Sequence, residues 1–160
     1  MMFAVIAAFS ALLVMTHPSV TEEEELLLVM SAETVMQLYN DGRFEEIADS
    51  LVDDKSLGED RTPIDRSRRI LQALFRQLNK ATGRCSESID DYRVGRTRSI
   101  PRFQIAFELD CEKRPLELVL HWGRKSGQLF FIGYSLPVSY YSDIPEIREH
   151  RQEIWGTGQR

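Results

Sequence analysis

Cysteine is scarce in this chain, and several kinds of functional motif are missing altogether. Two cysteines occur among 160 residues, and their spacing does not form a self-sufficient zinc site. The sequence holds no glycine-rich phosphate loop, no calcium loop and no recognisable Ser, His and Asp spacing. A net charge of −5 gives no overall positive field, which argues against nucleic acid as a partner. We therefore predict no metal, no cofactor and no catalytic residue set.

The first 20 residues differ from the rest of the chain. The run MMFAVIAAFSALLVM contains no charge, and THPS follows it. Its length suits the apolar core of a signal peptide, although no Lys or Arg precedes it and no A-x-A cleavage site follows it. We expect residues 1–20 to be a signal peptide or membrane-targeting leader of an exported, periplasmic or extracellular protein. An uncleaved membrane anchor and a buried N-terminal helix are the alternatives.

Three helices are predicted between residues 21 and 83. Thr21-Glu22-Glu23-Glu24 has the pattern of a capping box, so this acidic run marks a helix start rather than an acidic binding tail. Gly42 ends the first helix, Thr62-Pro63 starts the third with Thr62 as its cap, and Gly83 ends it. Apolar residues at helical spacing mark the buried faces: Leu28, Ala32, Val35 and Tyr39, then Phe44, Ile47, Ala48 and Leu51, then Ile64, Leu71, Leu74, Phe75 and Leu78.

After Gly83 the apolar period changes from that of a helix to that of a strand, which predicts four antiparallel strands. A hairpin centred near residues 98–99 would pair Val94 with Phe103 and Tyr92 with Ile105. The sequence GRKSG predicts the turn before the last strand, and residues 138–160 form a tail with a short helix. Separate runs of helix and strand indicate an α+β fold, with three N-terminal helices packed on a curved four-stranded antiparallel sheet.

The two cysteines test the register of these strands. One bulge at residues 90–91 keeps the apolar alternation in phase and puts Ile89 opposite Phe107. The same register places Cys85 opposite Cys111, which predicts a disulfide. Closing this loop would stabilise the fold by about 3 kcal/mol in the chain-entropy model, and it fits an oxidising compartment. Two buried free thiols in a cytosolic core are the alternative.

Strand alternation also divides the sheet into two faces. The almost wholly apolar face is expected to point inward, and it carries Tyr92, Val94, Phe103, Ile105, Phe107, Leu109, Leu118, Leu120, Trp122, Leu129 and Phe131. The mixed outer face carries Glu108, Asp110, Glu117, Val119, His121, Phe130, Ile132 and Tyr134. An apolar patch on an open sheet needs a cover, which is either the C-terminal tail or a second copy of the chain.

Three features of the chain resemble the nuclear transport factor 2-like (cystatin-like cone) superfamily: the stretch AETVMQLYNDGRFEEIADSL, the helix end at Gly83, and the stretch HWGRKSGQLFFIGYSLP. The similarity covers roughly residues 31–137, so residues 21–137 are interpreted as such a domain, most like small exported bacterial members of unknown function. The resemblance implies a cone whose sheet wraps a helix-lined pocket, and dimers through the outer sheet face. The superfamily includes enzymes such as scytalone dehydratase and ketosteroid isomerase alongside non-catalytic binding modules, so the fold does not choose the function.

Two candidate sites follow from the two faces. The cone interior would hold a small apolar ligand, in a pocket lined by Tyr39, Phe75, Tyr92, Phe107, Trp122 and Phe131. The outer face would contact a homodimer partner or an envelope protein through Val119, His121, Phe130, Ile132 and Tyr134. In the third reading, large aromatic side chains fill the cone and leave no pocket.

The inner face has no Asp, Glu or His along its later strands, which favours a non-enzymatic binding or protein-interaction module. The alternative is a cone-pocket lyase or isomerase that uses an acid–base residue such as His121. The other interpretation of His121 is a surface or interface residue packed between Val119 and Phe130.

Alkylation of the purified protein without reductant should add no label to its intact mass, because both thiols are expected to be oxidised. Reduction before alkylation is the control and should add two labels. Two labels without reduction would remove the disulfide from the interpretation.

Overall fold

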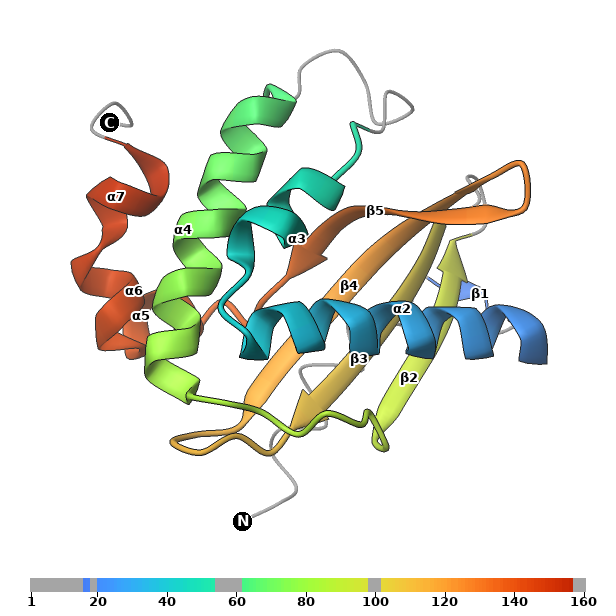
Figure 1. The fold of residues 1–160 in the computed structure, drawn as a ribbon, viewed down its shortest axis with the longest axis horizontal. Coiled ribbons are helices and arrows are strands. Elements are labelled where there is room, and N and C mark those ends of the chain that lie inside the picture. The colour runs from blue at the N-terminus through green and yellow to red at the C-terminus, as the bar shows by residue number, and fades with distance from the viewer. Residues whose placement is uncertain (1–15, 18–19, 54–61, 98–101, 157–160) are drawn as a thin grey trace.

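The computed structural model describes residues 16–17, 20–53, 62–97 and 102–156, and it confirms the α+β class. Figure 1 shows helix α2 crossing the strands on one face of an open antiparallel sheet, with α3 and α4 beside it. The strand order is β1-β2-β3-β4-β5, so the four predicted strands follow one another as a meander. The additional strand β1, Thr16–His17, pairs with the end of β2.

The three N-terminal helices are α2 (Glu22–Asn40), α3 (Phe44–Ser50) and α4 (Ile64–Thr82). The capping box of α2 is confirmed, because Thr21 Oγ1 accepts the Glu24 N–H at 3.2 Å and Glu24 Oε2 accepts the Thr21 N–H at 3.0 Å. Gly42 has φ +71°, the left-handed conformation that allows the chain to leave α2 and start α3 directly. The predicted cap of α4 is wrong, since its N-cap is Pro63 and no side chain caps this end.

The main strands are β2 (Tyr92–Thr97), β3 (Arg102–Leu109), β4 (Leu116–Lys125) and β5 (Gln128–Ser135). Ser126 and Gly127 connect β4 to β5 with φ of 52° and 78°, the two positive angles of a type I′ turn. The turn therefore lies within the predicted GRKSG segment, whose first three residues belong to β4.

The predicted register of β2 against β3 is wrong by two residues. Val94 pairs with Ile105, and Tyr92 pairs with Phe107. Because side chains alternate with a period of two, a two-residue shift leaves every side chain on its predicted face. An irregular segment between Cys85 and Tyr92 takes the place of the predicted bulge at residues 90–91, and the disulfide between Cys85 and Cys111 is confirmed.

The C-terminal tail contains three short helices where one was predicted: α5 (Tyr140–Asp143), α6 (Pro145–Glu149) and α7 (Arg151–Trp155). Helices α6 and α7 pack on α4, with Ile144, Ile147 and Ile154 buried in the core. The described part of the tail therefore extends the helical layer rather than covering the outer sheet face.

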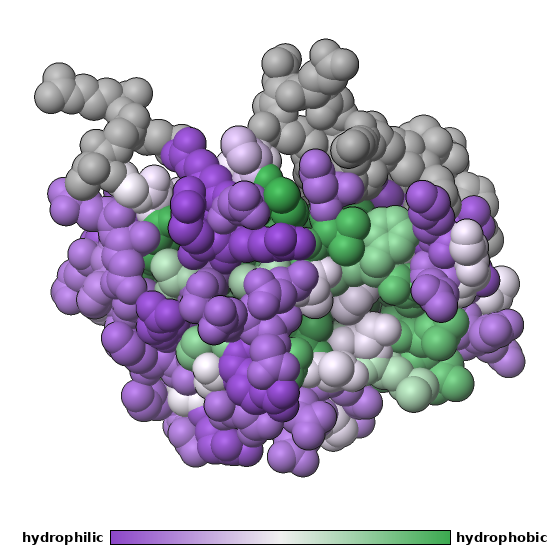
Figure 2. All heavy atoms as spheres, turned by 45° about the horizontal axis from the view of Figure 1, so that its top comes forward, coloured by the Kyte–Doolittle hydropathy of each residue, from purple (hydrophilic) through white to green (hydrophobic). Residues whose placement is uncertain are grey.

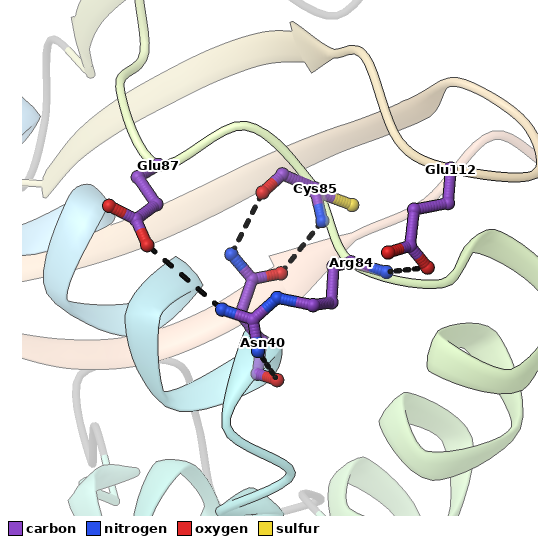
Figure 3. A network of polar contacts seen from close by, with 5 residues as sticks. All are labelled: Asn40, Arg84, Cys85, Glu87 and Glu112. Atoms are coloured by element: carbon purple, nitrogen blue, oxygen red, sulfur yellow. Dashed lines mark hydrogen bonds and ion pairs between the residues drawn. The ribbon is translucent and has the colours of Figure 1, made fainter.

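A polar clasp joins the end of α2 to the chain that follows α4 (Figure 3). The Asn40 side chain donates to the Cys85 carbonyl oxygen at 2.9 Å and accepts the Cys85 N–H at 2.8 Å. The Arg84 guanidinium donates to the Asn40 carbonyl oxygen at 3.2 Å, and the Arg84 N–H donates to Glu112 at 3.1 Å. We call these four residues and Cys111, the disulfide partner of Cys85, the Asn40 clasp.

Replacing Asn40 with Ala should lower the free energy of unfolding by roughly 2–4 kcal/mol, because it leaves two buried backbone groups of Cys85 without partners. Urea unfolding measures the loss. Gln37→Ala, an exposed position on the same helix, is the matched control and should change stability by less than about 0.5 kcal/mol. Equal stability of the two variants would mean that the clasp does not hold α2 in place.

Candidate functional site

A cleft of about 480 Å³ opens where the end of α3, the start of α4 and the middle of β5 meet. Its volume lies in the range of small-molecule sites. Ten of the described residues line this edge cleft: Leu51, Val52, Asp53, Thr62, Ile64, Ser67, Ile70, Ile132, Gly133 and Tyr134. It therefore lies at the edge of the sheet and not between the sheet and α2.

A bulge in β5 shapes one wall of the edge cleft. His121 pairs with Gly133, whereas the next residue of β4, Trp122, pairs with Phe131. Ile132 is therefore the extra residue of β5, and the strand changes its alternation at this point. As a result Tyr134 shares a face with Leu120, its cross-strand partner, and its ring lies 5.1 Å from that of Phe75.

This bulge overturns part of the predicted outer face. Tyr134 was expected there and instead lies on the inner side, against α4. Ile132 lines the edge cleft together with Tyr134. Three predicted interface residues, Val119, His121 and Phe130, do lie on the outer face.

The opposite wall is held by hydrogen bonds from two directions. The Val52 N–H donates to the Phe131 carbonyl oxygen at 2.8 Å, so the chain after α3 runs along the edge of β5. The Arg68 side chain of α4 donates to the Leu51 carbonyl oxygen at 2.9 Å. These bonds tie the three elements of the edge cleft together, which makes it a largely preformed site.

The lining combines apolar side chains with a few polar groups. Thr62 and Ser67 contribute hydroxyls, and Asp53 and Tyr134 are the ionisable residues among the ten. Burial, with a smaller contribution from Tyr141, raises the pKa of Tyr134, so its phenol is protonated at neutral pH and is able to donate a hydrogen bond. The exposed surface of the cleft is more polar than apolar, so it suits a small molecule that carries both apolar and polar groups.

Five of the six side chains predicted to line the cone pocket are packed in the hydrophobic core. Tyr39, Phe75, Phe107, Trp122 and Phe131 are all buried in one hydrophobic core. The hydroxyl of Tyr39 lies 2.8 Å from that of Thr82, and the rings of Trp122 and Phe131 are 5.3 Å apart.

Tyr92, the sixth predicted pocket residue, is partly buried and donates to Glu25 at 2.8 Å. None of the six lines the edge cleft. The six residues therefore remain a predicted ligand pocket that their packing does not support.

His121 lies in a polar row across the outer face. Its Nδ1 is 3.1 Å from the Gln104 side-chain nitrogen, and its Nε2 is 2.8 Å from Ser135 Oγ. Burial, with a smaller contribution from Arg102, lowers the pKa of His121 to about 4. The imidazole is therefore neutral at neutral pH and is a weak general base there, which favours a structural role over the acid–base role.

Several lining residues of the edge cleft were not predicted as site residues, among them Asp53, Thr62 and Ser67. The Thr62-Pro63 signal did place the start of α4 to within two residues. What the sequence did not reveal is that this helix start lies beside a bulge some 70 residues further along the chain.

Comparison with known proteins found no relative of this chain. No protein-family model, curated protein or solved structure matches the chain. We therefore infer the function from the residues of the edge cleft and of the outer face.

As the pH is lowered from 7 to 4.5, the free energy of unfolding should decrease more steeply in the wild-type protein than in His121→Gln. An unfolded histidine binds a proton near pH 6.5, whereas folded His121 resists protonation down to about pH 4, so unfolding gains a proton between these values. The contribution of His121 is complete above pH 6.5 and is lost as the pH falls, on the order of 1–3 kcal/mol by pH 4. Urea unfolding at pH 7, 5.5 and 4.5 measures this difference. A ring-proton titration midpoint near 6.5 by NMR, with parallel stability profiles, would contradict it.

Proposed function

We propose that this chain is an exported, non-enzymatic binding module that holds a small ligand with apolar and polar groups in the edge cleft. The observation that carries the proposal is a preformed cleft of about 480 Å³ whose described lining mixes apolar side chains with hydroxyls, a carboxylate and backbone groups. Membership of the nuclear transport factor 2-like superfamily is part of the same proposal. The supporting features are the helix order, the meander sheet and the pinched connection between α2 and α3.

The disulfide supports the cellular part of the proposal. A bond between Cys85 and Cys111 indicates an oxidising, exported environment. No helix within the described ranges is long and apolar enough to cross a membrane. We propose the periplasm or the extracellular space as the compartment, with the predicted leader at residues 1–20 as the signal.

A lyase or isomerase is the second candidate function, and one observation favours it. Asp53 and the protonated Tyr134 line the same cleft, which provides a carboxylate and a hydrogen-bond donor for proton transfer. This alternative now depends on Asp53 rather than on His121, because His121 lies on the other face of the sheet.

A homodimer through the outer face is a separate proposal that the edge cleft does not require. The surface would be formed by the partly exposed His121 and Phe130, because Val119, the third predicted residue of that face, is buried. Sedimentation of the purified protein at several concentrations tests it independently of any ligand.

A neutral fluorescent apolar probe, N-phenyl-1-naphthylamine, should bind to the wild-type protein, and its binding should be much weaker in the Ser67→Phe variant. The new ring would occupy the edge cleft, so the affinity should fall at least about tenfold. Arg69→Phe places the same ring at an exposed position of α4 outside the lining and should bind the probe as the wild type does. Equal binding by all three proteins would remove the edge cleft as the ligand site.

Native mass spectrometry of the protein from its own envelope fraction then separates the two functions. The binding module should carry a reproducible extra mass that Ser67→Phe lacks. Incubation of the extracted ligand with fresh protein should return it unchanged. Conversion of that ligand by the wild type, blocked in Asp53→Asn, would establish the enzyme instead.

A further inference from the structure

Helix α2 carries apolar side chains on the side that faces solvent. Its inward positions Leu28, Ala32 and Met36 are fully buried, as expected for a helix on a sheet. On the other side Leu26, Leu27 and Met30 are 60%, 36% and 55% exposed. Met30 lies four residues from Leu26 and three from Leu27, so the three side chains are neighbours on one helix face. We call them the α2 strip.

The exposed hydrophobic side chains of the described residues are concentrated in the α2 strip rather than scattered over the surface. Of the five large hydrophobic residues exposed in the described part of the chain, three belong to the strip, and the other two are Val52 and Val138. Figure 2 shows hydrophobic surface gathered on the right-hand part of the face it draws, with hydrophilic side chains around it. Exposed apolar side chains that gather in this way mark interaction sites more often than single ones do.

Acidic side chains precede the strip at the start of α2. Two of the four glutamates serve the fold, because Glu24 accepts from Arg124 at 2.6 Å and Glu25 accepts from Tyr92 at 2.8 Å. Glu22 and Glu23 are exposed beside the strip. The helix dipole supplies only roughly half a positive charge at this end, so the surface next to the strip stays negative.

We propose that the α2 strip is the docking site for a basic amphipathic helix of a partner protein. The apolar side of such a helix would contact Leu26, Leu27 and Met30, and its Lys or Arg side chains would pair with Glu22 and Glu23. The same features argue against a second copy of this chain as the partner that binds the α2 strip. Three side chains offer far less than the roughly 800 Å² per partner of a stable dimer, and the first turn of a second α2 would bring further glutamates.

The test uses two synthetic peptides of about 18 residues, one of Lys and Leu in an amphipathic helical pattern and one with Glu in place of Lys. The disulfide-bonded protein should bind the Lys–Leu peptide at least about tenfold more tightly than the Glu–Leu peptide. Isothermal titration at two salt concentrations measures both affinities, and that of the Lys–Leu peptide should weaken as salt rises.

Matched variants assign that binding to the strip. Leu26→Ser with Met30→Ser should weaken the Lys–Leu peptide at least about tenfold, whereas Val138→Ser should not. Glu22→Gln with Glu23→Gln should weaken it and flatten its salt dependence. Glu45→Gln with Asp49→Asn, which removes the same charge from exposed positions of α3, should do neither. All substituted positions are exposed, so circular dichroism should show an unchanged fold.

Three results would overturn the proposal. Equal binding of the two peptides would show that charge does not select the partner. Equal weakening by the strip variants and by their controls would show that the peptide binds elsewhere. A dimer in sedimentation that the Leu26 and Met30 variant abolishes would assign the strip to a second copy of this chain.

Discussion

The rest of the structure depends on the two-way hydrogen bonding between the Asn40 side chain and the backbone of Cys85. An asparagine side chain has the same donor and acceptor as a peptide group, so Asn40 pairs with Cys85 much as a neighbouring strand would. The pair fixes the last turn of α2 against the chain that leaves α4, and the disulfide fixes that chain to the end of β3. This polar contact thus fixes where the end of α2 lies against the chain that leaves α4, within a mainly apolar core.

Aromatic side chains of α2, of α4 and of the inner sheet face fill the space between the helices and the sheet. Tyr39 and Phe75 are fully buried, and their rings meet edge to face at 5.9 Å. The edge cleft lies where regular strand packing is interrupted, and that interruption is the extra residue Ile132. The bulge turns Tyr134 toward the helices, whereas the next residue, Ser135, lies on the outer face beside His121. The position of the cleft is therefore a consequence of strand geometry and not of a hollow core.

The fold could be predicted from the sequence where the signals were local. The capping box at Thr21, the glycine after α2 and the change of apolar period after Gly83 each depend on neighbouring residues, and each gave the right element. The predicted inner and outer faces of β2 and β3 were right although the register was wrong, because the register error was an even number of residues. The predicted faces were wrong at the end of β5. One extra residue reverses the alternation there, and no single residue type in the sequence indicates such a bulge. The edge cleft was missed for the same reason, because its lining comes from segments that meet only after the bulge has formed.

Strand β1 adds a consequence for the maturation of the chain. Thr16 and His17 pair with Thr97 and Arg96, and so occupy part of the free edge of β2. Cleavage of a leader after residue 20 would remove β1 and leave the backbone of β2 open to pairing with another chain. The charged side chains of Arg93 and Arg96 on that strand would then act as gatekeepers against edge-to-edge aggregation in the processed protein.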